Sequence, residues 1–176
     1  MSGHSKWSQI KHKKGISDQK KGQVFSKLSK KISIAAKDGA DPSTNFKLQA
    51  VINEARVENM PKENIERAIK RASDKDTASL KEVIIQAMGP AGIALVIEGI
   101  TDNSNRTVGD VRTILNRNDF KIVHEGSLNW MFDKEKNPTM PLEISDQQLL
   151  SKIDKAMEEL DSNDDVENVY TNVTLS

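Results

Sequence analysis

The hydrophobic period of the chain changes between residues 73 and 80, and this change limits the fold to two parts of different type. Before it, apolar residues recur every three to four positions, as they do in amphipathic helices. After it, runs of β-branched and apolar residues alternate with two further helical patterns. The polar stretch 73–79 between the two patterns is predicted to be a linker.

Three amphipathic helices are predicted before the linker, and they occupy residues 17–38, 41–58 and 61–72. Gly39 is the expected stop of the first helix, and Asp41-Pro42-Ser43-Thr44 is a start signal for the second. Residues 1–16 have no sustained period and are interpreted as an extended basic arm. The resulting prediction is an arm over 1–16 followed by an all-α, three-helix domain over 17–74.

The second part, residues 80–176, is predicted to be an α+β domain. Its elements follow the order of two strands, a helix, two strands, a possible short strand, a helix and a final strand. We place them at 83–88, 93–100, 104–116, 120–123, 128–132, 140–144, 146–160 and 166–173. This order suits a small sandwich in which an antiparallel or mixed sheet is covered by two helices on one face. The predicted fold class is therefore α plus α+β.

The formal net charge is zero, but the charges are distributed unevenly. Residues 1–72 carry 16 basic and 7 acidic side chains, whereas residues 73–176 carry 10 basic and 19 acidic ones. Within residues 1–37, ten lysines face a single acid, Asp18. A concentration of lysine of this kind is typical of proteins that bind a phosphate backbone, although it also occurs in solubilising arms.

The sequence offers little for catalysis. It has no cysteine, and its three histidines are not spaced as metal ligands, so we expect no metal site, no cofactor and no small-molecule substrate. Its serines and threonines form no recognisable nucleophile motif, and we predict that the protein is not an enzyme. No apolar run approaches the length of a membrane helix, so we expect a cytoplasmic protein without membrane partners. We also expect the protein to act as a monomer.

The best candidates for nucleic-acid binding lie in the arm and on the first helix. Lysines supply positive charge there, and the rings of Trp7 and two histidines can stack on unpaired bases. An arm of this composition fits irregular RNA better than a uniform groove. The alternative is a plain tail with Trp7 packed against the helices. The predicted binding residues are His4, Lys6, Trp7, Lys11, His12, Lys13, Lys14, Lys20, Lys21, Lys27, Lys30 and Lys31.

Two loops of the second part are weaker candidates for an anion or ribosome contact. Gly89-Pro90-Ala91-Gly92 precedes a strand and lacks the lysine of a phosphate loop, so it is interpreted first as a hairpin turn. Asn105 and Arg106 lie at a predicted helix N-terminus, where free N–H groups favour anions, although capping explains most of this motif. The candidate residues here are Gly89, Pro90, Gly92, Asn105 and Arg106.

Several motifs taken together resemble the YebC family, which includes the mitochondrial translational activator of cytochrome c oxidase subunit I. The motifs are Gly3-His4-Ser5-Lys6-Trp7, Ile10-Lys11-His12-Lys13, Asp18, Phe25-Ser26-Lys27-Leu28, Asp41-Pro42, residues 59–70, 89–92, 101–107 and 164–170. Ala91 stands where the family usually has glycine.

The resemblance implies an all-α domain followed by two α/β domains, the third inserted within the second. Here the chain passes from Met131-Phe132-Asp133-Lys134 almost directly to Pro138 and the returning half of the second domain. The inserted third domain is therefore expected to be absent near 134–138.

The family implies a non-catalytic regulator of gene expression that binds nucleic acid. Some members are labelled DNA-binding transcriptional regulators, and others act on translation by engaging the ribosome and relieving stalls. The lysine-rich arm favours ribosomal RNA as the target and a stall-relieving translation factor as the function, with DNA-binding transcriptional regulation as the alternative.

Overall fold

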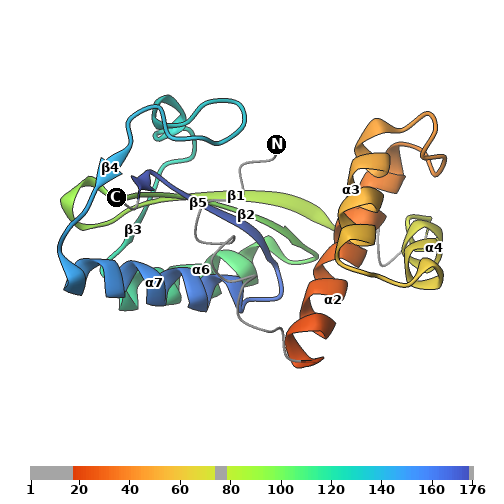
Figure 1. The fold of residues 1–176 in the computed structure, drawn as a ribbon, viewed down its shortest axis with the longest axis horizontal. Coiled ribbons are helices and arrows are strands. Elements are labelled where there is room, and N and C mark those ends of the chain that lie inside the picture. The colour runs from red at the N-terminus through yellow and green to blue at the C-terminus, as the bar shows by residue number, and fades with distance from the viewer. Residues whose placement is uncertain (1–17, 74–78, 175–176) are drawn as a thin grey trace. The chain divides into compact units, whose positions relative to one another are not determined.

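The computed structural model describes residues 18–73 and 79–174 of the chain. The contacts divide these residues into two compact units. The helical unit comprises the described residues up to Glu82 together with 100–104, and the α/β unit comprises 83–99 and 105–174. Figure 1 shows the elements of both units, which are described separately below.

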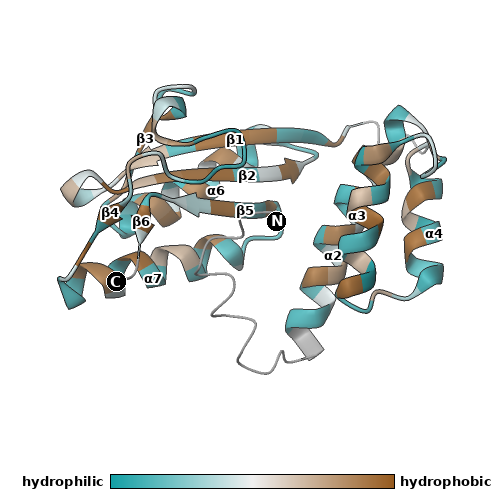
Figure 2. Cartoon of the chain, turned by 45° about the horizontal axis from the view of Figure 1, so that its top comes forward, coloured by the Kyte–Doolittle hydropathy of each residue, from teal (hydrophilic) through white to brown (hydrophobic). Residues whose placement is uncertain are grey.

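The helical unit is built from α2 (Asp18–Ala35), α3 (Phe46–Val57) and α4 (Lys62–Arg71), and α2 packs against both of the others. Each helix carries apolar and hydrophilic residues (Figure 2), and the apolar ones meet in one core. Leu28, Ile32, Leu48, Ile52 and Ile65 are buried in it. A short 3₁₀ turn, Ala36–Asp38, ends α2, and Gly39 follows with a φ of 142°, which glycine adopts most readily. The predicted stop at Gly39 is confirmed.

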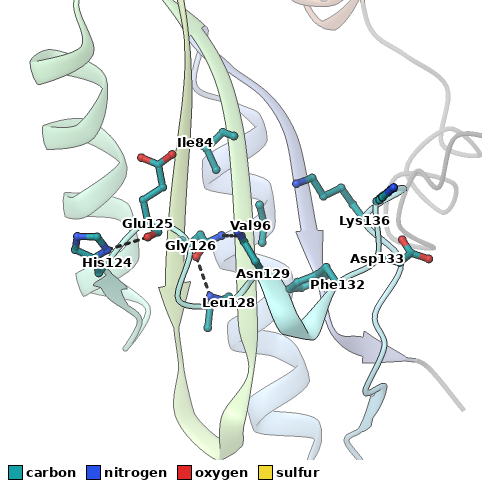
Figure 3. Close-up of a pocket in the computed structure, with 12 residues that line it drawn as sticks. Ile84, Val96, His124, Glu125, Gly126, Leu128, Asn129, Phe132, Asp133 and Lys136 are labelled. Carbon is teal, nitrogen blue, oxygen red and sulfur yellow. Dashed lines mark hydrogen bonds between the residues drawn. The ribbon is translucent and has the colours of Figure 1, made fainter.

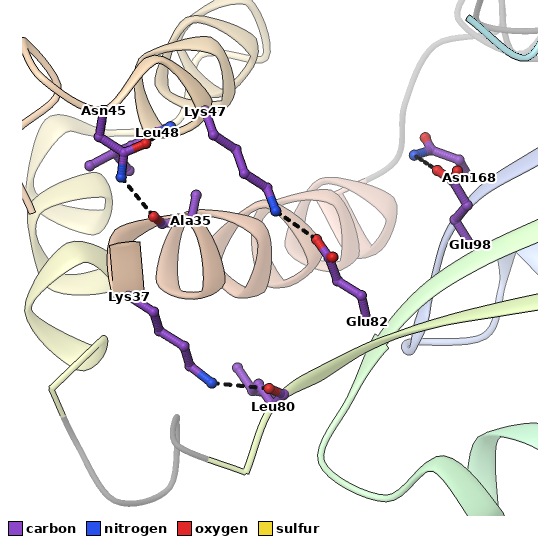
Figure 4. A network of polar contacts seen from close by, with 9 residues as sticks. All are labelled: Ala35, Lys37, Asn45, Lys47, Leu48, Leu80, Glu82, Glu98 and Asn168. Carbon is purple, nitrogen blue, oxygen red and sulfur yellow. Dashed lines mark hydrogen bonds and ion pairs between the residues drawn. The ribbon is translucent and has the colours of Figure 1, made fainter. Parts of the chain in front are cut away.

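The predicted start of the second helix is wrong, because α3 begins four to five residues later. Asp41 forms a local turn in which its Oδ1 accepts the backbone N–H of Ser43 at 2.9 Å. The N-cap is Asn45, whose Oδ1 accepts the N–H of Leu48 at 3.0 Å. Its Nδ2 donates to the carbonyl of Ala35 at 2.8 Å (Figure 4) and to that of Gly39 at 2.7 Å. One buried amide thus caps α3 and also ties it to the end of α2.

The α/β unit contains a four-stranded antiparallel sheet in the order β3-β1-β2-β5. The strands are β1 (Lys81–Met88), β2 (Ala94–Thr101), β3 (Lys121–Val123) and β5 (Val166–Thr171). Helices α6 (Ser104–Arg117) and α7 (Gln147–Asp161) cover one face of this sheet (Figure 1). The main core lies between the sheet and these helices, where Leu95, Ile97, Leu115, Ile153 and Leu160 are buried. The predicted fold class is confirmed.

The β1–β2 connection is a hairpin turn, as predicted. Gly89 N donates to Ile93 O at 2.8 Å, and Ile93 N donates to Pro90 O at 3.2 Å. Ala91 and Gly92 both have positive φ values, 56° and 82°. A tight hairpin turn requires two successive residues of positive φ. Alanine is strained in this conformation because its Cβ lies too close to the following carbonyl oxygen, whereas glycine has no Cβ.

The segment 128–132 was predicted to be a strand, and this is wrong. Residues Asn129–Met131 form a 3₁₀ turn instead, and only Phe132 makes a β-bridge, with Pro138. The side chain of Gln86 accepts the backbone N–H of Leu128, so this N–H is not available to a neighbouring strand. Downstream, β4 (Leu142–Glu143) and β6 (Val173–Thr174) form a small parallel sheet.

Candidate nucleic-acid interface

The described lysines among the predicted binding residues all lie on helix α2. Lys20 and Lys21 are exposed, whereas Lys27 and Lys30 are half-buried. Positions 20, 27 and 31 fall within a narrow stripe of a helix, because a seven- or eleven-residue spacing returns to nearly the same direction. The structure therefore brings part of the predicted set to one side of α2.

Lys31 is held against the neighbouring helix α3. Its ammonium group forms an ion pair with Glu54 of α3 at 2.9 Å, and only 17% of its side chain is exposed. A lysine held in this way stabilises the α2–α3 contact and presents little charge to a partner. Lys37 likewise makes an internal contact, since its Nζ donates to the carbonyl of Leu80 at 3.0 Å (Figure 4).

The other predicted nucleic-acid-binding residues lie outside the described part of the chain. These residues are His4, Lys6, Trp7, Lys11, His12, Lys13 and Lys14. Their role remains a prediction from sequence.

The two weaker candidate loops lie at opposite ends of strand β2. Gly89, Pro90 and Gly92 belong to the hairpin turn before it, and Asn105 and Arg106 follow its other end on α6. Eight residues of strand span roughly 26 Å, so the two loops do not form a single site.

Arg106 makes a contact within the α/β unit. Its Nη2 lies 2.8 Å from Oδ2 of Asp165, and the Thr107 hydroxyl donates to the same oxygen at 2.8 Å. The Asp165 side chain is 10% exposed, whereas that of Arg106 is 48% exposed. Arg106 thus ties the start of α6 to the loop before β5, and binding of an external anion would compete with this ion pair.

Sequence reasoning did not identify a cavity on the sheet face opposite α6 and α7. It has a volume of about 550 Å³, and its lining includes Ile84, Gln86, Val96, Asn129, Phe132 and Lys136 (Figure 3). Gln86 is 2% exposed. Its amide donates to Asn129 Oδ1 at 2.9 Å while its own oxygen accepts Leu128 N–H at 2.9 Å. The segment over the sheet is thereby held in place. The predicted sandwich has helices on one sheet face only, and nothing in the sequence analysis indicated the segment that folds over the other face.

The described residues contain no group of three or more histidine, aspartate or glutamate side chains that could hold a metal ion. Within the same residues no helix is both long and apolar enough to cross a membrane.

The two parts of the chain match two families of domains. Residues 5–75 match the family described as the TACO1/YebC protein N-terminal domain, and residues 80–137 match that described as the TACO1/YebC second and third domain. A relative from Chlorobium chlorochromatii is 46% identical over 178 residues, which cover 99% of this chain and 70% of the relative. The chain belongs to the TACO1/YebC family.

Other TACO1/YebC relatives agree with this assignment. A protein from Geobacter sulfurreducens is 49% identical over 137 residues, covering 77% of this chain and 56% of its own length. Both this relative and the Chlorobium protein are named probable transcriptional regulatory proteins. The crystal structure of a conserved hypothetical protein from Aquifex aeolicus superposes with a TM-score of 0.85 at 25% identity, covering 98% of each chain.

Proposed function

We propose that this TACO1/YebC protein is a non-catalytic, nucleic-acid-binding regulator of gene expression that acts on the ribosome and relieves stalled translation. The observation that carries the proposal is the concentration of ten lysines against one acid in residues 1–37. Lysines that neutralise phosphates release condensed counterions, and this release drives binding to RNA or DNA. The family membership and the names of the relatives support a regulatory role.

The unequal charge of the two parts supports ribosomal RNA over a regular duplex. The arm combines lysines with Trp7, His4 and His12, and flat rings of this kind stack on the unpaired bases of folded RNA. Residues 73–176 carry nine more acids than bases, so phosphate repels them unless they face solvent or basic protein. The proposed arrangement therefore docks the arm and the exposed lysines of α2 on rRNA.

In the proposed mechanism, docking of the arm places the α/β unit near the tRNA or the peptidyl-transfer region. The Gly89 to Gly92 turn is the tip of the β1–β2 hairpin, and in this proposal it reaches inward. The absence of the family's third domain near 134–138 is part of the same proposal. It limits the expected contacts to those of the arm, α2 and the α/β unit.

Co-sedimentation with ribosomes at increasing salt tests the proposal. Changing Lys11, Lys13 and Lys14 to glutamate is expected to abolish co-sedimentation, because the arm then repels phosphate. The matched control reverses three exposed basic residues of the α/β unit, Arg112, Lys121 and Lys155, and is expected to leave co-sedimentation unchanged. Equal losses in the two triple variants would contradict the assignment of binding to the arm.

DNA-binding transcriptional regulation is the second candidate, and the printed names of the relatives favour it. A DNA regulator should protect a defined promoter far better than random duplex at physiological salt. Crosslinking in cells, followed by sequencing of the bound nucleic acid, distinguishes the two candidates. Crosslinks confined to promoters would overturn the ribosome proposal, and crosslinks to rRNA would support it.

A further inference from the structure

Helix α3 carries a second apolar stripe, on the side that faces away from the core of the helical unit. Phe46 is 85% exposed and Val57 is 77% exposed. They lie at the two ends of α3, and at about 100° per residue their spacing returns to nearly the same direction on the helix. Ala50 and Asn53, which are also exposed, project between them. Phe46, Ala50, Asn53 and Val57 are called here the α3 stripe.

The exposure of the α3 stripe does not come from a loosely held helix. Leu48, Ile52 and Ala55, on the opposite side of α3, are buried in the core of the helical unit. Asn45 caps the N-terminus of the same helix. Single exposed apolar side chains are common on protein surfaces, whereas two on one line of a firmly packed helix are typical of a contact surface.

The spacing of the α3 stripe is that of a seam between helices. Its members follow one another at intervals of four, three and four residues, the alternation that forms the contact line of a coiled coil. Ala50 is small, so a second helix can approach closely at the middle of the stripe. Phe46 and Val57 supply apolar area at its two ends. The pattern therefore points to another helix as the occupant.

The α3 stripe is complementary to itself when two copies of α3 run antiparallel. Phe46 of one copy then faces Val57 of the other, and Ala50 of one copy faces Asn53 of the other. A large side chain thus meets a smaller one at each end, and every contact occurs twice, as a two-fold symmetric interface requires. Antiparallel helices also oppose their dipoles, which parallel helices do not.

The charges beside the α3 stripe match this antiparallel arrangement. Lys47 and Glu58 lie on the same flank of the stripe near opposite ends of α3, so Lys47 of each copy comes beside Glu58 of the other. Within its own unit Lys47 pairs with Glu82 at 2.9 Å, but these side chains are 53% and 58% exposed (Figure 4). An ion pair this exposed contributes little to stability, so Lys47 is able to exchange partners.

We propose that two copies of the chain associate through their α3 stripes as an antiparallel, two-fold symmetric dimer. The contact covers one side of a twelve-residue helix, which is about 18 Å long. Obligate homodimers bury roughly 2,000 Å² or more, and this contact is smaller, so the association is weak and reversible, with a dissociation constant of tens to hundreds of micromolar. The dimer departs from the monomer expected from the sequence, and it does not depend on nucleic-acid binding by the arm.

Sedimentation equilibrium of the full, nuclease-treated chain tests the proposal. Between micromolar and millimolar concentration, the average mass is expected to rise from 19.6 kDa toward twice that value. Phe46→Ser and Val57→Ser should each weaken association by about tenfold or more, because each removes an apolar anchor at both ends of the interface. The matched control, Trp130→Ser, changes an exposed apolar residue of the other unit and should leave association unchanged.

Three outcomes of this experiment would overturn the proposal. The first is a mass that stays at 19.6 kDa at every concentration. The second is association that neither variant of the α3 stripe weakens, and the third is equal weakening by Phe46→Ser and Trp130→Ser. Circular dichroism verifies that each variant is folded. The variant with Lys11, Lys13 and Lys14 changed to glutamate should dimerise like the unchanged protein, which separates a failure here from a failure of the nucleic-acid proposal.

Charge reversal tests the antiparallel direction. Lys47→Glu and Glu58→Lys should each weaken the dimer by about three- to tenfold, because each places like charges side by side at both ends of the interface. The double variant should recover most of the lost affinity, since acid and base have then exchanged places. A double variant that associates no better than the weaker single variant would refute the antiparallel pairing.

Discussion

The ammonium group of Lys31 on α2 lies 2.9 Å from Oε1 of Glu54 on α3, so one of the predicted binding lysines is part of the internal structure of the helical unit. Lys31→Ala should lower the free energy of unfolding by about 1 kcal/mol, since the partly buried carboxylate loses its partner. Lys47→Ala, which removes a more exposed pair with Glu82, should cost no more than about 0.5 kcal/mol. Urea denaturation of the unchanged protein and of the two variants measures both losses in the free energy of unfolding.

The same lysine should contribute little to nucleic-acid affinity. Lys20→Ala is expected to reduce the slope of log affinity against log salt for single-stranded RNA by roughly 0.7, the amount associated with one phosphate contact. Lys31→Ala is expected to leave that slope unchanged, because its charge already faces Glu54. Equal reductions in the two variants would show that the ion pair opens on binding.

The sequence predicted most elements of the fold because its signals were local. The change of hydrophobic period marked the two parts, and Gly39 and the 89–92 turn ended elements where the backbone needs positive φ. The errors arose where a distant side chain decides the local structure. Residues 128–132 have the composition of a strand, but Gln86, 42 positions earlier, binds the N–H of Leu128 and the segment turns instead.

The candidate site was predictable only as a set of charges. The concentration of lysines in residues 1–37 is visible in the sequence, but it does not show that Glu54 lies opposite Lys31, because this depends on how α3 packs. The exposure of Trp130 was missed for a similar reason. Trp130 is adjacent in sequence to buried Met131, and nothing in the local pattern distinguishes the exposed side chain from the buried one.

Asn45 should be the most sensitive polar residue of the helical unit. Asn45→Ala removes the cap of α3 and leaves the carbonyls of Ala35 and Gly39 without their amide donor, so we expect a loss of roughly 2–3 kcal/mol. Asn53→Ala on the exposed side of α3 is the matched control and should change stability by less than about 0.5 kcal/mol. Chemical denaturation gives both values, and similar losses in the two variants would contradict the role assigned to the buried amide.

Ala91 offers a stabilising substitution. Its φ of 56° lies in the left-handed region, so Ala91→Gly should raise the free energy of unfolding by about 1 kcal/mol by relieving a steric clash. Ala50→Gly on the exposed face of α3 should have the opposite effect and cost roughly 0.5–1 kcal/mol. Thermal or urea denaturation shows whether each substitution raises or lowers the free energy of unfolding. A destabilised Ala91→Gly variant would show that this turn does not strain alanine.

Gly99 should not tolerate a side chain. It lies at an irregularity in the β2–β5 pairing, and an added Cβ would come within 2.5 Å of the backbone oxygen of Asp165. A backbone atom cannot rotate away, so Gly99→Ala should cost roughly 2 kcal/mol. Gly109→Ala is the control, because nothing lies within 4 Å of the added Cβ and α6 should gain about 0.5–1 kcal/mol. Equal free energies of unfolding for the Gly99→Ala and Gly109→Ala variants would contradict the close approach of position 99 to the backbone oxygen of Asp165.

The turn between Asp133 and Asn137, which closes the Phe132–Pro138 bridge, should open in acid. The side-chain amide of Asn137 and then its backbone N–H lower the pKa of Asp133 below its ordinary value of 3.8, because both donate to the carboxylate. The folded-state pKa is the lower one, so the stabilisation is complete above the unfolded pKa and disappears as pH falls through the folded one. The amide resonance of Asn137, followed by NMR between pH 6 and 2, should therefore shift with a midpoint below 3.8. Asn137→Ala should move the Asp133 midpoint upward, toward 3.8, by removing the largest cause of the shift. An Asp133 midpoint that is the same in both proteins would mean that Asn137 does not hold the turn closed.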